Sequence, residues 1–373
     1  MSDKPLLSIC IPTFSRADLL EPMLESLCPQ VAELEGEVEI VVSDNCSPDR
    51  TPDVVAAAQG VWPISYFRND RNVGSPNMLL AVERARGEYC WLLGDDDMVA
   101  QGSLRRIIDT IHDQPDVGFI FLNYAIERVE VRDKLIREEG SRYEPPLERC
   151  ICTDGESRRL DSWERLFDIA GPARCQLNTS LSSGAFRRCV WLKYCGTLRF
   201  NGAPHVSAMD RHVDDLFPHL KIWAQAFTGR PVFYVGSPNF LMGSGGQPWL
   251  SDWPVISMMG INEALELYEE LGFDGARMRR LWRSFFEHCA AYMPVIGGSR
   301  DMPCLDDFSF VGFAWRNRRR RDVLARVVAR RSVDQARTWL ASKVPPPLWA
   351  PIRGTYRAAR EAAMRARGGT GDS

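Results

Sequence analysis

The chain has 373 residues, of which 45% are hydrophobic and 25% are charged. This length can bury a full core, as one large domain with appendages or as two domains, and the composition argues against overall disorder. The longest apolar stretch, at 117–126, is too short to span a bilayer, and the N-terminus lacks the pattern of a secretion signal. We therefore expect a cytoplasmic protein. None of the 11 cysteines forms a Cys-x-x-Cys pair, so we expect free thiols, Cys150 and Cys152 among them.

The formal net charge of −3 conceals an acidic body and a basic C-terminal segment. Residues 316–373 contain 15 Lys or Arg against 4 Asp or Glu, whereas the first 315 residues contain 31 against 45. Five arginines at 316–321 precede apolar residues at helical spacing: Val323, Leu324, Val327 and Val328. This basic amphipathic pattern suits a solvated helix docked on the acidic body or peripheral contact with an anionic membrane. Sparse aromatic residues argue against nucleic acid, and we expect the last eight residues to be disordered.

Apolar strands alternate with helical patterns over the first hundred residues. We expect strands at 6–12, 38–42, 64–68 and 89–93. The first helix should begin near Asp18, so that Pro22 lies in its first turn, and later helices should begin near Thr51 and Pro76. Near-continuous apolar strands alternating with helices predict an α/β fold, with a mostly parallel central sheet and helices on both faces.

The second part of the chain gives weaker patterns. We expect strands at 117–125 and 231–235, helices at 162–170 and 262–271, and a loop or insertion at 127–160. A glycine run from Gly243 to Gly246, near Gln247 and Trp249, is either a flexible loop that folds over a ligand or an ordinary turn. Phosphate-binding and dinucleotide-binding glycine motifs are absent, which argues against a kinase or a dehydrogenase.

An acidic triplet, Asp95, Asp96 and Asp97, directly follows the fourth predicted strand. In parallel sheets ligands bind where strands end, and the other three strands end at Pro12-Thr13, Ser43-Asp44 and Arg68-Asn69. Three adjacent carboxylates repel one another, so their position after a buried strand predicts a hard divalent cation, Mg²⁺ or Mn²⁺. A triplet alone also occurs as a solvated loop, and the expected convergence of four strand ends favours the metal.

Four ordered motifs extend these predictions over about residues 6–110. They are Leu-Ser-Ile-Cys-Ile-Pro-Thr-Phe-Ser-Arg, Glu-Ile-Val-Val-Ser-Asp-Asn-Cys-Ser-Pro-Asp, Tyr-Phe-Arg-Asn-Asp-Arg-Asn-Val-Gly and Gly-Glu-Tyr-Cys-Trp-Leu-Leu-Gly-Asp-Asp-Asp. Together they resemble family 2 glycosyltransferases with the GT-A fold, in the bacterial branch that includes abequosyltransferase-like enzymes.

The resemblance implies roles for the residues at the strand ends. Pro12, Thr13 and Asp44 would hold the base and ribose of a nucleotide-sugar donor. UDP or dTDP is favoured because a carboxylate accepts the imide N–H of uracil or thymine. A helix cap is the alternative role of Asp44. The remaining residues that the resemblance places on the donor or the cation are Arg68, Asn72 and Gly74 in a closing loop, Asp95 and Asp96 on the donor, and Asp95 and Asp97 on the metal. A surface turn is the alternative for the loop.

Inverting transfer also needs a base for the acceptor hydroxyl. Many relatives place a Glu-Asp pair before the segment that corresponds to 216–235, and no such pair stands here. We expect Asp215 to be the base, with His219 as the second candidate. Alternatively, Asp214 and Asp215 cap a helix opened by Pro218, and His219 is structural or completes a metal shell.

The resemblance thus implies a metal-dependent, inverting glycosyltransferase that uses a glycan or lipid-linked glycan acceptor in surface polysaccharide or glycoconjugate assembly. The alternatives are a nucleotide-sugar-binding scaffold without turnover and a sugar nucleotidyltransferase. The second would need a glycine-rich basic loop that residues 13–16 do not supply. We expect a GT-A domain at 1–240, with its acceptor side from about 110, a glycine loop and helical extension at 241–315, and the basic segment at 316–373.

Overall fold

The computed structural model describes residues 4–34, 36–139, 142–171, 174–200, 213–245, 253–298, 313 and 316–320. The chain divides into two units, 1–315 and 316–373. In the second unit, the 3-10 helix η9 (Arg318–Arg320) falls within the described residues. The predicted amphipathic pattern after residue 321, and Gly246, Gln247 and Trp249 of the first unit, lie outside them.

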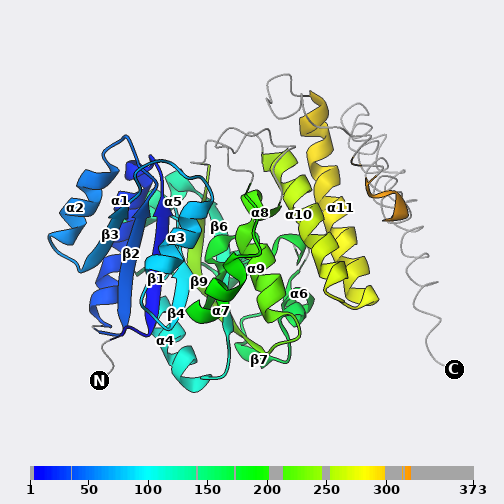
Figure 1. Cartoon of the computed structure of the whole chain (residues 1–373), viewed down its shortest axis with the longest axis horizontal. Helices are drawn as coiled ribbons and strands as arrows, with labels where there is room; N and C mark the ends of the chain where they lie inside the picture. Colours follow the sequence, from blue (N-terminus) through cyan, green and yellow to red (C-terminus); the bar gives the residue numbers. More distant parts are fainter. Residues whose placement is uncertain are drawn as a thin grey trace, which may run out of the picture. The chain divides into compact units, whose positions relative to one another are not determined.

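Four parallel strands form the first half of the sheet (Figure 1), and they are the four that the sequence predicts. They are β1 (Leu7–Thr13), β2 (Val38–Asp44), β3 (Ile64–Arg68) and β4 (Tyr89–Leu92). β1 lies between β2 and β4, and β3 pairs with the other side of β2. Nearly every residue of β1, β2 and β4 is buried, as continuous apolar runs predict for strands covered on both faces. The expected α/β class is confirmed.

The second half of the sheet mixes strand directions. Its strands are β5 (Met98–Val99), β6 (Phe119–Arg128), β7 (Arg158–Leu160), β8 (Gly184–Arg187) and β9 (Val232–Ser244). Within the described residues the strand order is β3-β2-β1-β4-β8-β6-β9-β5, and β7 also pairs with β9. β6 and β9 are parallel, whereas the pairings of β5, β7 and β8 are antiparallel. β9 runs through position 240, where a domain border was expected, and the glycine run therefore begins inside a strand.

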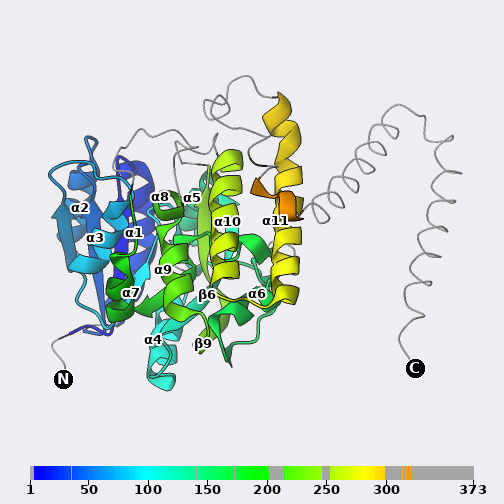
Figure 2. The same ribbon diagram turned by 45° about the vertical axis from the view of Figure 1, so that its right-hand side comes forward.

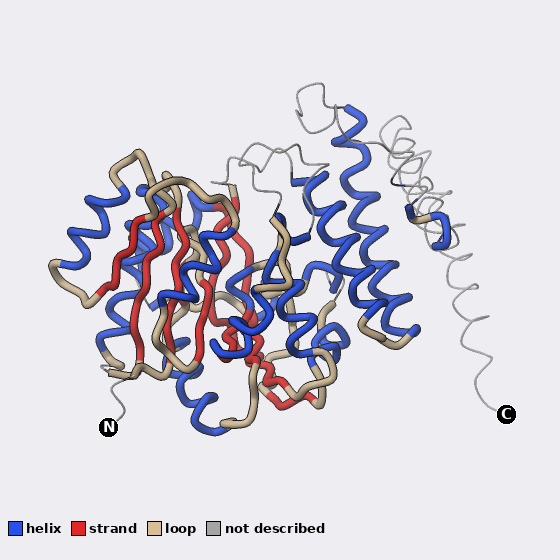
Figure 3. Tube along the Cα trace, viewed as in Figure 1, coloured by secondary structure: helices blue, strands red, loops and turns tan. Residues whose placement is uncertain are grey.

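Helices cover both faces of the sheet. They are α1 (Ala17–Ala32), α2 (Thr51–Gln59), α3 (Pro76–Arg84), α4 (Ser103–Asp113), α5 (Val129–Glu139), α6 (Leu166–Ile169), α7 (Arg188–Cys195), α8 (Val213–Leu216), α9 (Pro218–Phe227), α10 (Trp253–Glu270) and α11 (Gly275–Gly298). Short 3-10 helices are η2 (Leu147–Arg149), η3 (Trp163–Arg165), η4 (Arg174–Gln176) and η5 (Leu181–Ser183). α3 packs in front of β1 and β2, and α1 lies behind the strands (Figure 3). α10 and α11 pack side by side (Figure 2). Among the helices described, none combines the length and apolar character needed to cross a bilayer.

Two local predictions are wrong. α1 begins at Ala17, one residue from the predicted start, but Pro22 is its sixth residue and lies beyond the first turn, where it was not expected. The helix tolerates the missing backbone bond because its apolar face, which includes Leu20 and Leu27, is fully buried. The segment 127–160 is not a loop throughout, since α5 follows β6 directly. The mixed polar composition of α5 concealed its helical character.

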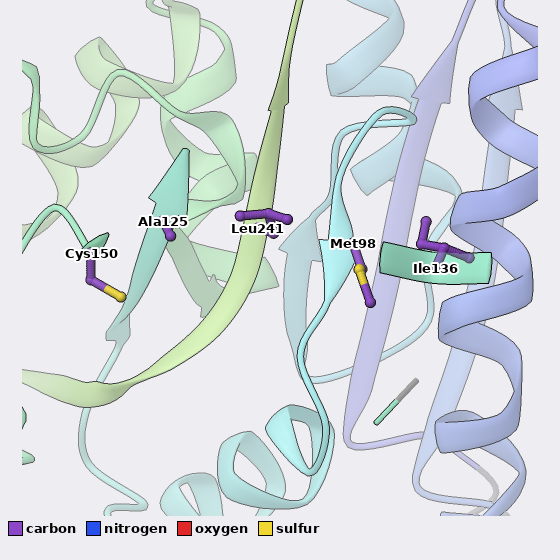
Figure 4. Close-up of a cluster of buried hydrophobic side chains, with 5 residues drawn as sticks. All are labelled: Met98, Ala125, Ile136, Cys150 and Leu241. Carbon is purple, nitrogen blue, oxygen red and sulfur yellow. The ribbon is translucent and has the colours of Figure 1, made fainter. Parts of the chain in front are cut away.

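A small cluster of buried hydrophobic side chains includes the residue that follows the acidic triplet in the sequence. Figure 4 shows this cluster. Its members are Met98, Ala125, Ile136, Cys150 and Leu241. Met98 on β5 pairs in register with Leu241 on β9. The residue after Asp97 is therefore fixed by both strand pairing and burial, which makes the triplet a tight connection between β4 and β5. Cys150 and Cys152 are free thiols, as expected.

Candidate active site

The predicted donor residues lie side by side at one edge of the sheet. Thr13 pairs in register with Asp44, and Asp44 pairs with Arg68. Pro12, the neighbour of Thr13 on β1, is partly buried. The Thr13 hydroxyl donates to Asp95 Oδ2 at 2.8 Å, which joins the end of β1 to the segment after β4. The four strand ends therefore meet, as the sequence predicts for a parallel sheet.

Asp97 is enclosed by hydrogen-bond donors from three separate segments. Ser182 Oγ donates to Asp97 Oδ2 at 2.5 Å, and the Gly94 amide approaches the same oxygen at 3.2 Å. The Gly243 amide donates to Oδ1 at 3.2 Å. Ser182 is itself positioned by Trp91, whose indole N–H donates to the Ser182 carbonyl at 2.7 Å. Sequence reasoning missed Ser182, because no local signal connects it to a carboxylate far away in the chain.

Gly243 allows β9 to pack directly against the triplet. A Cβ atom at this position would lie 2.0 Å from the Asp96 backbone oxygen. This distance is far inside van der Waals contact, and the obstacle is backbone rather than a movable side chain. Glycine is required at position 243 because the two backbones approach closely. The glycine run was expected to be a flexible loop or a turn, so this reason for Gly243 was not predicted.

Arg16 supplies the cation that pairs with the first two carboxylates. Its Nη1 lies 2.5 Å from Asp95 Oδ1, and its Nη2 lies 2.6 Å from Asp96 Oδ2. Burial opposes the charge of Arg16, but Asp95 and Asp96 outweigh burial and raise the pKa of Arg16 above its ordinary value. Arg16 stands in the first of the four sequence motifs, and no role was predicted for it. Its position directly after a strand end, opposite a predicted acidic cluster, was the available signal.

The triplet is short of positive charge. Burial raises the pKa of Asp95 to about 6 against the effect of Arg16, while the charge of Asp96 adds to the rise. Burial also raises the pKa of Asp97 to about 8, again with Asp96 adding to the rise and with Ser182 opposing it. Clustered oxygen ligands that lack compensating charge fit Mg²⁺ or Mn²⁺.

The residues can supply only part of a metal shell. Over the described ranges, no group of three His, Cys, Asp or Glu side chains is arranged to hold a metal ion. Mg²⁺ commonly takes one or two carboxylates and completes its shell with substrate phosphates and water. Asp95 and Asp97 fit that pattern, and the remaining ligands would come from a bound diphosphate and water.

Asp44 is fully buried at the end of β2 and already has three donors. The Tyr66 hydroxyl donates to Oδ2 at 2.6 Å, Arg68 Nε lies 3.3 Å from the same oxygen, and the Ser47 amide donates to Oδ1 at 2.9 Å. A carboxylate offers about four acceptor positions, so the described donors leave one of them unfilled. The role of Tyr66 was not predicted, although Tyr66 stands two residues before Arg68 on β3 and therefore lies on the same face of the strand.

The loop expected to close over the donor is held by side-chain amides. Asn72 Oδ1 accepts from the Asn45 side chain and from the Gly74 amide, each at 2.8 Å. Asn45 Oδ1 in turn accepts from the Val73 amide at 2.8 Å. Gly74 has a φ of +69°, which glycine adopts without strain. The loop is thus a preformed turn beside Asp44, with the local geometry that the surface-turn alternative predicts.

The two candidate bases lie in different surroundings. Asp215 is partly buried, and its carbonyl accepts from Ser75 Oγ at 2.6 Å, which places α8 beside the turn at Gly74. His219 is 2% exposed, and its ring lies 3.1 Å from the Asn178 carbonyl. Burial lowers the pKa of His219 to about 4, so the ring is neutral and weakly basic at pH 7. The neighbouring Asp214 pairs with Lys221 Nζ at 2.8 Å and serves the packing of α8 on α9.

Strand order, strand-end polar residues and the buried acidic connection together give the GT-A fold of nucleotide-diphospho-sugar transferases. Residues 8–179 match the family described as glycosyl transferase family 2. The resemblance expected from the sequence is confirmed.

Known relatives match part of the chain. The abequosyltransferase of Salmonella typhimurium is 37% identical over 115 residues, which are 30% of this chain and 34% of that protein. The GalNAc(5)-diNAcBac-PP-undecaprenol β-1,3-glucosyltransferase of Campylobacter jejuni is 33% identical over 127 residues, which are 33% of this chain and 40% of that protein. The chain therefore spans about a third of the length of the curated relatives it matches.

A solved structure gives the same fold over a longer stretch. Staphylococcus aureus TarS is 15% identical, with a TM-score of 0.51, over 81% of this chain and 76% of that one. The likeness concerns the fold, and it extends beyond the residues that match the family.

Proposed function

We propose that this chain transfers a sugar from a nucleoside-diphosphate sugar to a hydroxyl group, with inversion at the anomeric carbon and with Mg²⁺ or Mn²⁺ as cofactor. The observation that carries the proposal is the buried acidic triplet after β4, joined to the end of β1 by the bond from Thr13 to Asp95. The match of residues 8–179 to glycosyl transferase family 2 supports the reaction class.

The donor would bind across the ends of β1, β2 and β3. The remaining acceptor position of Asp44 suits the imide N–H of uracil or thymine, so UDP and dTDP sugars are the preferred donors. TarS has been crystallised with UDP-GlcNAc, which supports a uridine donor for this fold. A relative named for an undecaprenol-linked substrate supports a glycan or lipid-linked glycan acceptor, reached from the cytoplasm. Peripheral membrane contact through the basic segment belongs to the same proposal.

Each residue of the site would have a distinct task. Asp95 and Asp97 would hold the divalent cation, which when bound neutralises negative charge on the diphosphate leaving group. Thr13 orients Asp95, and Ser182 and the Gly243 amide orient Asp97. Such supporting donors fix a ligand carboxylate before the substrate arrives.

Asp215 would act as the base. Its carboxylate would accept the proton of the acceptor hydroxyl while the acceptor oxygen bonds to the anomeric carbon and the bond to the diphosphate breaks. Asp215 is preferred to His219 because the imidazole is enclosed and its pKa is lowered to about 4. Asp214 is excluded by its ion pair with Lys221.

Calorimetric titration of UDP, dTDP, GDP and CDP, with Mn²⁺ and again with EDTA, tests the proposal. We expect UDP or dTDP to bind tightly only when the metal is present. If no nucleoside diphosphate binds under either condition, the proposed site is wrong.

Two matched variants then separate chemistry from structure. Asp215→Asn should abolish turnover and leave nucleotide binding within about twofold. Asp214→Asn should lower the free energy of unfolding by roughly 1–3 kcal/mol, because it leaves Lys221 without its charged partner. Retained turnover in Asp215→Asn would exclude Asp215 as the base.

A further inference from the structure

The backbone before α1 departs from ordinary helix geometry to place Arg16 over the triplet. Arg16 is the N-cap residue of α1, and its side chain makes no capping hydrogen bond. A cation is disfavoured at a helix N-terminus, where Ser, Thr, Asp or Asn is usual. Ser15, immediately before it, has a φ of +53°, which is strained for a residue with a side chain. Such local costs mark positions selected for something other than stability.

The second strand-end loop holds this unusual geometry in place. The Ser15 amide donates to Ser47 Oγ at 2.8 Å, and the Ala17 amide donates to Asp49 Oδ2 at 3.0 Å. Asp49 therefore supplies the cap that Arg16 does not. The Arg16 side chain does not cap the helix, and its guanidinium pairs with Asp95 and Asp96 instead.

Two buried guanidinium nitrogens have no acceptor among the described residues. Arg16 Nε is buried and has no hydrogen-bond partner within the described part of the chain. Arg132 is fully buried on α5, where its Nε and Nη2 pair with Asp133, and its Nη1 likewise has no described partner. Buried donors are almost always satisfied, so an acceptor-rich anion is the missing group. A nucleoside diphosphate has phosphate oxygens of this kind.

We propose that Arg16 is an exchangeable counter-ion. In the ligand-free protein it neutralises Asp95 and Asp96, and on donor loading it gives up these carboxylates to the divalent cation and pairs with the diphosphate. The inference rests on the proposed function, because it assumes that the triplet receives a metal-bound nucleotide.

The proposed exchange and a purely structural role of Arg16 predict opposite changes in metal affinity when Arg16 is removed. An arginine that competes with the metal lowers the affinity of the protein for the metal alone, so its removal raises that affinity. An arginine that merely shapes the site would do the reverse, since its removal would disorder the carboxylates. The sign of the change therefore separates the two roles.

The test compares Arg16→Met with the wild type and with Arg50→Met as a matched control. Arg50 also bridges two carboxylates, Asp18 and Glu21, but on the exposed surface. Mn²⁺ alone is titrated first, by electron paramagnetic resonance of the free ion. UDP and dTDP are then titrated by calorimetry at saturating Mn²⁺.

We expect Arg16→Met to bind Mn²⁺ alone about tenfold more tightly than the wild type, and to bind the nucleoside diphosphate about tenfold more weakly. Arg50→Met should change neither affinity by more than about twofold. If Arg16→Met does not fold, Arg16→Gln carries the same expectation, because it keeps amide donors for the carboxylates without the charge.

Unchanged or weaker Mn²⁺ binding by the variant, with normal binding by the wild type, would overturn the counter-ion role and leave the proposed function standing. Unchanged nucleotide affinity would overturn the transfer of Arg16 to the diphosphate. Wild-type protein that binds neither Mn²⁺ nor any nucleotide would instead refute the proposed function, and the role of Arg16 with it.

Discussion

Ser182 and Ser183 are adjacent, fully buried serines, yet only Ser182 touches the acidic triplet. Ser182→Ala removes the 2.5 Å hydrogen bond to the buried Asp97 carboxylate. It also removes the acceptor that receives the Gly94 amide at 3.0 Å. Above pH 8 the Asp97 carboxylate is ionised, because burial raises its pKa only to about 8. Hydrogen bonds to charged groups contribute about 1.5–3 kcal/mol, so we expect the free energy of unfolding to fall there by about 2 kcal/mol.

Ser183→Ala serves as the control for this change. The Ser183 hydroxyl donates to the neutral Ser180 carbonyl at 2.8 Å, and its loss should cost about 1 kcal/mol. Urea unfolding of both variants, with EDTA present, measures the difference in stability. The variants should differ more clearly in metal binding. Removing a donor that orients a metal ligand typically weakens metal affinity by about 10–100-fold, whereas Ser183→Ala should leave it unchanged. Equal Mn²⁺ affinities in the two variants would refute the assignment of Asp97 as a ligand held by Ser182.

Two further predictions concern stability. Burial lowers the pKa of His219 to about 4 from an ordinary 6.5, so unfolding takes up a proton between these values. Its stabilising contribution is complete above pH 6.5 and is lost as the pH falls, by about 2 kcal/mol between pH 7 and pH 5. The stability gap between wild type and His219→Asn should therefore narrow by that amount in urea titrations; a gap independent of pH would contradict the buried neutral ring. Gly243→Ala places a Cβ 2.0 Å from the Asp96 carbonyl and should cost about 1–3 kcal/mol and abolish Mn²⁺ binding. Gly196→Ala, where nothing lies within 4 Å, should change stability by less than about 1 kcal/mol; equal effects of the two alanines would exclude the steric account.

The sequence predicted the parallel half of the sheet because its strands are short, apolar and punctuated by polar turns. Thr13, Asp44 and Arg68 were foreseen at one edge, since parallel strands end together, and their register pairing follows from the same rule. The second half was harder to predict, because β8 and β9 join the sheet from distant segments and with mixed directions. Strand pairing at such separation leaves no local pattern in the sequence.

The residues of the site also divide into those that a local sequence pattern reveals and those that folding brings in from distant segments. The carboxylates stand in one run, and their chemistry can be read from the sequence directly. The groups that donate hydrogen bonds to these carboxylates or pair with their charge come from other parts of the chain. They are Ser182 in the turn before β8, Gly243 on β9 and Arg16 at the start of α1. Each is an ordinary residue type whose role depends on what folding places beside it, so only three-dimensional structure identifies it.

Backbone strain and buried negative charge at the ends of the parallel strands lower stability, and this argues that these residues serve a function. Two residues with side chains adopt positive φ in the described chain, Ser15 and Cys46, and they lie in the two loops that follow β1 and β2. The same edge buries three carboxylates whose mutual repulsion opposes folding. The apolar residues of β1 and of the cluster around Met98 show that the chain can build an ordinary core close by. Within the described residues, positive φ at residues with side chains and the run of three buried carboxylates both fall at these strand ends. Binding of a divalent cation and a diphosphate would relieve the repulsion and give the buried Arg16 Nε an acceptor.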